Sequence, residues 1–456
     1  MTREAARTLV VGTVAGEHET AVRMGSASYS YYYVARAFAP LLQRWGKVVE
    51  TVRPGKRLDR LVGDIQQRGS TVVHLGFLPL DAFHGTSHAP NVAYPFWDFP
   101  DLPASPLGGD PRNNWTAIAN TLDRIVTCSE FTRDAFVRSG VRTPISVVPV
   151  PVRPVYFDVP LWTDRRVVID CPCYDVPPVR TAAPRVSGGR RLYRRHMRPR
   201  LSARSVDALS AAGHAVSTMR GAWRGGKVVE CAVSHALELS GVVYTTAFNP
   251  FDSRKNWPDL LTAYLMALAD CDDATLVMKL ALPPDRGASG VNTILGFYRR
   301  LALTHRCRLV LVSDYLSDAQ MLELTRGSTY YLNASRAEGA CLPLQDFLAA
   351  ARPAIAPRHT AIADYFDGRS GFVADSHPEP ASWPQDPEGR CTTTQHRLVW
   401  TSLRDAIAES YQVATSRRSQ YDALAAHARA VMTARAGSDA VWRQLAPALD
   451  SVAHAL

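Results

Sequence analysis

Strand and helix signals alternate along the chain in two separate stretches, and this alternation constrains the fold more than any other feature. The first stretch covers about 150 residues, and the second begins near residue 241. Short runs of Val, Ile and Leu alternate with segments of helical spacing, such as residues 31–45 and 257–269. This pattern is typical of parallel sheets covered by helices on both faces. We therefore expect an α/β protein with two Rossmann-like, doubly wound domains.

The segments around the two stretches suggest a division into four parts. We expect an N-terminal Rossmann-like domain (1–153), a basic insertion or linker (154–240), a second Rossmann-like domain (241–425) and an Ala-rich helical tail (426–456). Prolines and glycines interrupt every periodic pattern in the insertion. Two doubly wound domains that face one another leave a cleft at the carboxyl ends of their strands, where α/β proteins bind ligands.

The positive charge of the chain is concentrated in the insertion. The formal net charge is +10, and the segment Arg180–Arg224 carries eleven arginines against a single acid, Asp207. This segment could contact an anionic membrane surface or a lipid-linked acceptor, bind an acidic glycan, or form a solvated flap. Only Tyr193 and Trp223 supply aromatic rings there, which argues against nucleic-acid binding.

The composition also bears on the cellular compartment of the protein and on whether it binds a metal. No apolar run approaches the roughly 18 residues that span a bilayer, and Leu9–Val14 is a core strand rather than a signal peptide by its length and flanks. We expect a cytoplasmic protein, with peripheral contact at the inner membrane face as an alternative. The eight cysteines are scattered, and the close pair Cys171 and Cys173 lacks a second pair at zinc spacing. We therefore expect neither a disulfide framework nor a metal site.

The most informative stretch is residues 333–357, NASRAEGACLPLQDFLAAARPAIAP. Its pattern predicts a strand end, a turn with Glu338 and Gly339, and a helix from near Leu344 with Asp346 in its first turn. Gly339 permits a close approach of a ligand to the backbone. Three amides would then face the cleft, those of Ala340, Cys341 and Leu342. A nucleotide-sugar needs such groups: amides for phosphate oxygens, one carboxylate for sugar hydroxyls and another for ribose hydroxyls.

This stretch resembles the signature of retaining glycosyltransferase family four, whose members have the GT-B fold. That signature is a Glu, then Gly-x-Gly-Leu-Pro-like residues, then a second acid eight positions after the first, and Glu338 and Asp346 have this spacing. Arg352-Pro-Ala-Ile-Ala is similar to the family's Gly-x-Pro-Val-Ile strand. Two positions depart from the pattern, because the second acid is Asp and Cys341 stands where glycine is usual. The resemblance covers 242–456 well and 10–152 loosely, and it leaves 154–238 unexplained.

The resemblance implies cationic residues at the donor's diphosphate. Residues 248–257, FNPFDSRKNW, are similar to the family's loop after the first strand of the donor domain. Lys255 is the better candidate by position and Arg254 is its neighbour. Cations there would stabilise the charge that develops on the leaving diphosphate. Lys279, at a strand end, is either a further phosphate contact or a snorkelling lysine.

The N-terminal domain supplies the candidates on the acceptor side. Many members of the family carry a His beside the sugar, and here Asp98 or Trp97 takes that place. Trp97 is alternatively a packed core residue. The run of tyrosines from Tyr29 to Tyr33, with Tyr31 at its centre, could stack on acceptor sugar rings or belong to the core of a helix, and its spacing favours neither.

The resemblance implies a hexosyltransferase-like enzyme with a nucleotide-sugar co-substrate, no other cofactor and no required metal. The anomeric configuration would be retained, and the C-terminal helix would cross back to the first domain. Glu338 would hold the donor sugar, Asp346 the ribose, and Lys255 with Arg254 the diphosphate, while the acceptor would be a glycan or lipid-linked glycan of the cell-surface polysaccharide type. Two alternatives stay open: a nucleotide-sugar epimerase of similar fold, and a degenerate module that only binds nucleotide-sugars.

Overall fold

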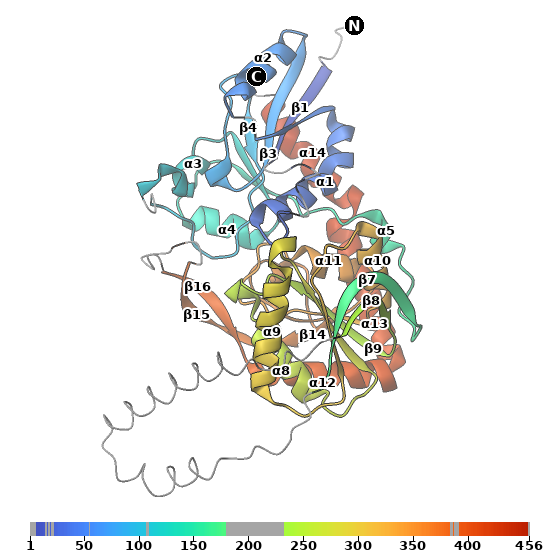
Figure 1. Cartoon of the computed structure of the whole chain (residues 1–456). Coiled ribbons are helices and arrows are strands. Elements are labelled where there is room, and N and C mark those ends of the chain that lie inside the picture. Colours follow the sequence, from blue (N-terminus) through green and yellow to red (C-terminus); the bar gives the residue numbers. More distant parts are fainter. Residues whose placement is uncertain are drawn as a thin grey trace, which may run out of the picture.

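The computed structural model describes residues 6–13, 16, 19, 22–53, 55–105, 109–178, 232–383, 386 and 392–454. The arginine-rich segment Arg180–Arg224, with its predicted membrane contact, lies outside the described residues. The described chain forms two α/β domains, drawn one above the other in Figure 1, each built on its own largely parallel sheet. The predicted fold class is confirmed.

The N-terminal domain contains a six-stranded parallel sheet in the order β2-β1-β3-β4-β5-β6. Its central strands are almost wholly buried, as helices on both faces require. The strands are β1 (Ala6–Thr13), β2 (Lys47–Val52), β3 (Ser70–Phe77), β4 (Asn91–Ala93), β5 (Arg124–Thr127) and β6 (Ile145–Val147). The helices are α1 (Ala27–Trp45), α2 (Leu58–Gln66), α3 (Trp115–Ala119) and α4 (Glu130–Arg138). The short α5 (Pro154–Phe157) that follows this domain packs against α11 (Leu342–Ala349) of the C-terminal domain.

The C-terminal domain contains an eight-stranded sheet in the order β14-β13-β12-β9-β10-β11-β7-β8. Its parallel part consists of β9 (Val242–Phe248), β10 (Ala274–Leu280), β11 (Arg308–Val312), β12 (Tyr330–Leu332), β13 (Ala354–Pro357) and β14 (Gly371–Ala374). The helices between and after these strands are α8 (Trp257–Ala267), α9 (Gly287–Leu301), α10 (Asp318–Gly327), α11 (Leu342–Ala349), α12 (Trp400–Ser416) and α13 (Arg418–Ala436).

The predicted insertion at 154–240 requires a correction. Two strands within it, β7 (Val167–Val176) and β8 (Ala232–Leu239), join the second sheet, where β7 pairs antiparallel with β11 and β8 pairs with β7. Pro172 interrupts the alternation of β7 in the sequence, and the structure has a register irregularity at that point, between Asp170 and Cys173. The flanks of the arginine-rich segment therefore belong to the C-terminal domain.

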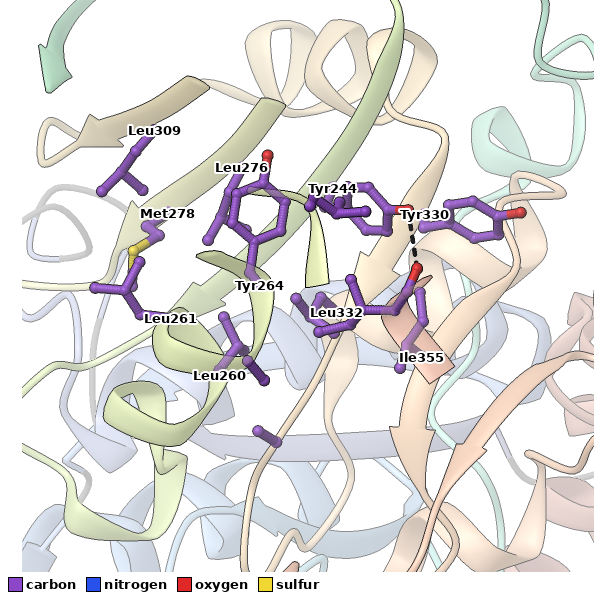
Figure 2. Close-up of a cluster of buried hydrophobic side chains, with 14 of the residues drawn as sticks. Tyr244, Leu260, Leu261, Tyr264, Leu276, Met278, Leu309, Tyr330, Leu332 and Ile355 are labelled. Atoms are coloured by element: carbon purple, nitrogen blue, oxygen red, sulfur yellow. Dashed lines mark hydrogen bonds between the residues drawn. The ribbon is translucent and has the colours of Figure 1, made fainter. Parts of the chain in front are cut away.

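The core of the C-terminal domain lies between its sheet and the helices that cover it. Figure 2 shows Tyr244 of β9 and Leu276 and Met278 of β10 beside Leu260 and Tyr264 of α8. All of β10 is buried, and burial of one such aliphatic side chain contributes about 1.5–3 kcal/mol. This packing fixes the carboxyl ends of the strands relative to one another.

The chain returns to the N-terminal domain at α14 (Ser438–Ala453). Helix α13 still packs against α11, whereas α14 places Val441, Leu445 and Leu449 in the core of the first sheet. Asp450 of α14 accepts hydrogen bonds from the Arg7 guanidinium and the Trp45 indole. The crossing helix therefore begins at 438 rather than at the predicted 426.

One element outside the two sheets was not predicted. β15 (Ser376–Ser382) and β16 (Thr392–Leu398) form an antiparallel hairpin inserted between β14 and α12. Within the described ranges, none of the helices has both the length and the hydropathy that crossing a bilayer requires.

Candidate functional site

The candidate site lies at the carboxyl ends of β9 and β12, which are parallel neighbours in the second sheet. The 3-10 helix η8 (Ser253–Lys255) follows β9, and the loop that carries Glu338 follows β12. Lys255 Nζ lies 2.7 Å from Glu338 Oε1, and Glu338 is only 5% exposed. The sequence places these two residues 83 positions apart, and the strand pairing brings them into contact.

Glu338 is held as an ionised carboxylate. Burial alone would raise the pKa of Glu338, but the charges of Lys255 and Arg254 outweigh that effect and hold the pKa below its usual range. The pair also holds the pKa of Lys255 above its usual value, against the opposing effect of burial. Ser335 Oγ donates to Glu338 Oε1 at 2.6 Å, and the Glu338 amide donates to Thr360 Oγ1 at 3.1 Å.

Arg254 connects the two domains through Asp98. Its guanidinium contacts Asp98 Oδ2 at 2.6 Å and Asp252 Oδ2 at 2.7 Å. The other Asp98 oxygen accepts the Gly339 amide at 2.8 Å, and Cys128 Sγ donates to the Gly339 carbonyl at 3.0 Å. The Asp98 carboxylate therefore binds the Arg254 guanidinium and the Gly339 amide, two groups that the sequence analysis assigned to donor binding.

Gly339 is predicted to permit a close approach to the backbone, and the structure shows such an approach by another part of the chain. A Cβ atom on Gly339 would lie 3.1 Å from the Trp97 carbonyl oxygen and 3.2 Å from the Trp97 amide nitrogen. The adjoining Ala340 and Leu342 pack against the core of the N-terminal domain. The loop after β12 is thus docked on the N-terminal domain in this structure.

Three residues with a strained backbone lie around Lys255 and Glu338. Asn256, Cys341 and Thr360 all have φ near +50°, a left-handed conformation that is costly for side chains other than glycine and most costly for a β-branched Thr. Asn256 and Cys341 are the N-caps of α8 and α11, and Thr360 accepts the Glu338 amide. The conformation of Cys341 explains why glycine is usual at its position in the family that the sequence resembles.

Asp346 lies two residues further into its helix than predicted. α11 begins at Leu342 rather than near Leu344, because Pro343 is accommodated in the first turn. Burial raises the pKa of Asp346 to about 7, with Arg153 opposing the shift and Asp318 adding to it. Burial raises the pKa of Tyr331 well above its usual value, and Cys341, Glu338 and Asp346 add to that shift by their charges. Among the described residues, no cation forms an ion pair with Asp346.

Three other candidates form no hydrogen bond or ion pair with Glu338 in the part of the chain that the structure describes. Lys279 is 5% exposed and donates to the Leu280 carbonyl at 2.8 Å and to Met24 Sδ at 3.6 Å, and burial lowers its pKa to about 8. Tyr31 is buried and stacks on Phe96, with ring centroids 4.1 Å apart. Trp97 is buried as well, and its indole donates to the Asp101 carbonyl. In this structure Tyr31 and Trp97 are therefore both packed in a core, as the second of the two interpretations from sequence had it.

Several residues of the site were missed from sequence. Asp252 could have been found, because Asp-Ser-Arg-Lys reads as a capped turn that places an acid beside Arg254. Ser335 and Thr360 hold Glu338, and Arg153 acts electrostatically on Asp346. The roles of Thr360 and Arg153 depend on contacts between separate segments, and the bond of Ser335 depends on how its own loop folds, so none of the three is indicated by a local pattern.

Solved glycosyltransferase structures match the chain over nearly its whole length. Sucrose-phosphate synthase from Thermosynechococcus elongatus is 13% identical with a TM-score of 0.56, covering 99% of this chain and 100% of its own. α,α-Trehalose 6-phosphate synthase from Burkholderia multivorans is 12% identical with a TM-score of 0.55, covering 99% of both chains. Anabaena HepE, solved with UDP and glucose, is 14% identical with a TM-score of 0.51, covering 98% of this chain and 100% of its own.

Sequence comparison adds nothing to these structural matches. No protein-family profile and no curated protein sequence matches the chain. Identities this low establish a common fold and not a common activity. The two parallel-sheet domains, the site between them and these matches together show that the chain has the GT-B fold of these glycosyltransferases.

Proposed function

We propose that the protein is a retaining glycosyltransferase that uses a nucleotide-sugar donor, with a UDP-sugar as the first candidate. The observation that carries this proposal is the buried Lys255–Glu338 pair with Arg254 beside it, at the carboxyl ends of β9 and β12. Two cations next to a carboxylate match a ligand with an anionic diphosphate and a hydroxyl-rich sugar. The UDP and glucose in the HepE structure support the choice of UDP.

In this mechanism the protein positions the reactants and stabilises charge. The bond between the sugar's anomeric carbon and the diphosphate oxygen breaks, and the acceptor hydroxyl forms its new bond on the same face. The leaving phosphate takes the acceptor's proton. Lys255 and Arg254 stabilise the charge that develops on the diphosphate, Glu338 accepts sugar hydroxyls and Asp346 accepts ribose hydroxyls. The amide of Leu342, at the start of α11, has no partner within its helix and would donate to a phosphate oxygen of the donor.

Donor binding must compete with Asp98. In this structure the Asp98 carboxylate takes the Arg254 guanidinium and the Gly339 amide, both of which suit the donor's diphosphate. Two anions that share these groups would repel one another. We propose that the diphosphate displaces Asp98, which then lies beside the donor sugar. A glycan or lipid-linked glycan in the cytosol is our proposed acceptor.

The experiment is a binding and transfer assay on paired lysine variants. Isothermal titration with UDP and with UDP-glucose should show binding that weakens at least about tenfold in Lys255→Ala. The control Lys47→Ala removes an exposed lysine on β2 and should bind as the parent does. Equal affinity in the two variants would refute the assignment of Lys255. With labelled donor and an acceptor extract, transfer supports the proposal, epimerised donor indicates an epimerase, and binding without turnover indicates a binding module.

A further inference from the structure

The β15–β16 hairpin extends from the C-terminal domain to the N-terminal domain. Figure 1 shows it rising beside the second sheet toward the level of α4. Trp383, directly after β15, is 5% exposed and packs in a hydrophobic cluster of the N-terminal domain with Trp97, Phe99 and Trp115. The Trp383 and Trp97 rings meet edge to face with centroids 5.9 Å apart. The hairpin is therefore anchored next to Asp98, across the domain interface.

The other side of the hairpin holds the loop that carries Glu338. The His396 amide of β16 donates to the Arg336 carbonyl at 2.9 Å, and the Arg336 amide donates to the Arg254 carbonyl at 2.7 Å. Glu379 of β15 accepts from the Arg336 guanidinium at 3.4 Å. The loop that carries Glu338 is therefore fixed between β16 on one side and η8, the turn that carries Arg254, on the other.

A histidine completes the connection from the hairpin to the carboxylate. His359 Nε2 lies 3.0 Å from the Ser335 carbonyl and must donate to it, so Nδ1 accepts from Ser376 Oγ of β15 at 2.8 Å. The ring also stacks on His396 of β16, with centroids 4.1 Å apart. Ser335 Oγ in turn donates to Glu338 Oε1. Two strands of the hairpin thus act on Glu338 through His359 and Ser335.

We propose that the β15–β16 hairpin couples closure of the two domains to the placement of Glu338, with Trp383 and His359 as positioning residues. When Trp383 is seated in the N-terminal domain, the hairpin holds Ser335 and Arg336 so that Glu338 is aligned for the donor sugar. When the domains separate, that restraint weakens. The inference rests on the proposed function, because it assigns a purpose to the position of Glu338.

The test compares truncation of Trp383 with truncation of a tryptophan elsewhere. Trp383→Ala should lower kcat for sugar transfer from UDP-glucose by about tenfold or more, since small misplacements of a reacting group are costly, while the Kd for UDP changes less than about twofold. Trp383→Phe should restore kcat. Among the described residues the buried Trp383 indole N–H has no hydrogen-bond partner, so Phe removes none. The control Trp442→Ala, on α14, should leave kcat unchanged.

A second readout separates this inference from the proposed function. Hydrogen–deuterium exchange of the peptide 333–339 should be faster in Trp383→Ala than in Trp442→Ala, whether or not UDP-glucose is the donor. If Trp383→Ala does not fold, His359→Ala should give the same faster exchange, with His359→Gln partly restoring protection. Unchanged exchange in a folded variant, or an equal loss of kcat in both tryptophan variants, would overturn the coupling. Failure of the unaltered protein to bind UDP would instead refute the proposed function.

Discussion

Donor affinity should depend on pH through Asp346. Burial raises the pKa of this carboxyl to about 7 in the ligand-free protein. Ribose hydroxyls would donate to its ionised form, so binding should lower that pKa and release a proton at neutral pH. Affinity for UDP-glucose should then be constant above about pH 7.5 and fall by up to tenfold per unit below pH 7. At pH 5.5, about 1.5 units below the pKa, the expected loss is up to about 30-fold.

Donor affinity rises with pH because the ionised form of Asp346 is the one that binds the donor. A raised carboxyl pKa means that the folded, empty site disfavours the charge, so the stability of the empty protein falls as pH rises from about 4 toward 7. Donor binding requires the charge, so affinity rises over the upper part of the same range. Within the described ranges, the charged groups that act on the pKa of Asp346 are Arg153, which opposes the shift, and Asp318, which adds to it.

The assay is calorimetric titration of UDP-glucose between pH 5.5 and 8.5 at constant ionic strength. A nucleotide-sugar is suited to it because neither phosphate ionises near neutral pH. Asp346→Asn should abolish the pH dependence, whereas the exposed control Asp439→Asn, on α14, should retain it. An affinity that does not vary with pH in the parent, or a dependence that survives in Asp346→Asn, would refute the assigned role of Asp346.

Four further outcomes follow from the site. Asp98→Asn should bind UDP several-fold more tightly, measured by calorimetry, because the carboxylate that competes for Arg254 loses its charge, while transfer slows. Gly339→Ala should destabilise the protein by about 1–3 kcal/mol in urea unfolding, since its Cβ meets the Trp97 backbone at 3.1 Å. Lys255→Ala should cost about 3–5 kcal/mol in the same measurement, and Glu338→Gln in that background should recover much of it, because no buried charge is then unpaired. Cys341→Gly should be about 1 kcal/mol more stable than Cys341→Ala, since both lose the thiol and only glycine relieves the positive φ.

The sequence alone determined the architecture, and it indicated Lys255 and Glu338 as candidates that the structure brings into contact. The alternation of apolar strands with helical segments is a local pattern, and it gave both parallel sheets. The spacing of Glu338 and Asp346 and the basic loop at Lys255 are equally local. The contact between Lys255 and Glu338 depends on the pairing of β9 with β12, which no local pattern indicates, because the loops after neighbouring parallel strands meet at one edge of a sheet.

The remaining features depended on contacts between distant parts of the chain. Asp98 meets Gly339 across 241 positions, and neither residue has a local pattern that indicates the pairing. Tyr31 and Trp97 look the same in sequence whether a ring faces a cleft or a core, and only the packing of the N-terminal domain decided that both are buried. The left-handed conformation of Cys341 is likewise imposed by the tight turn into α11. Periodicity records the environment of a segment along the chain, whereas the partner of a side chain is decided when separate segments pack, and that is why tertiary structure alone fixed these contacts.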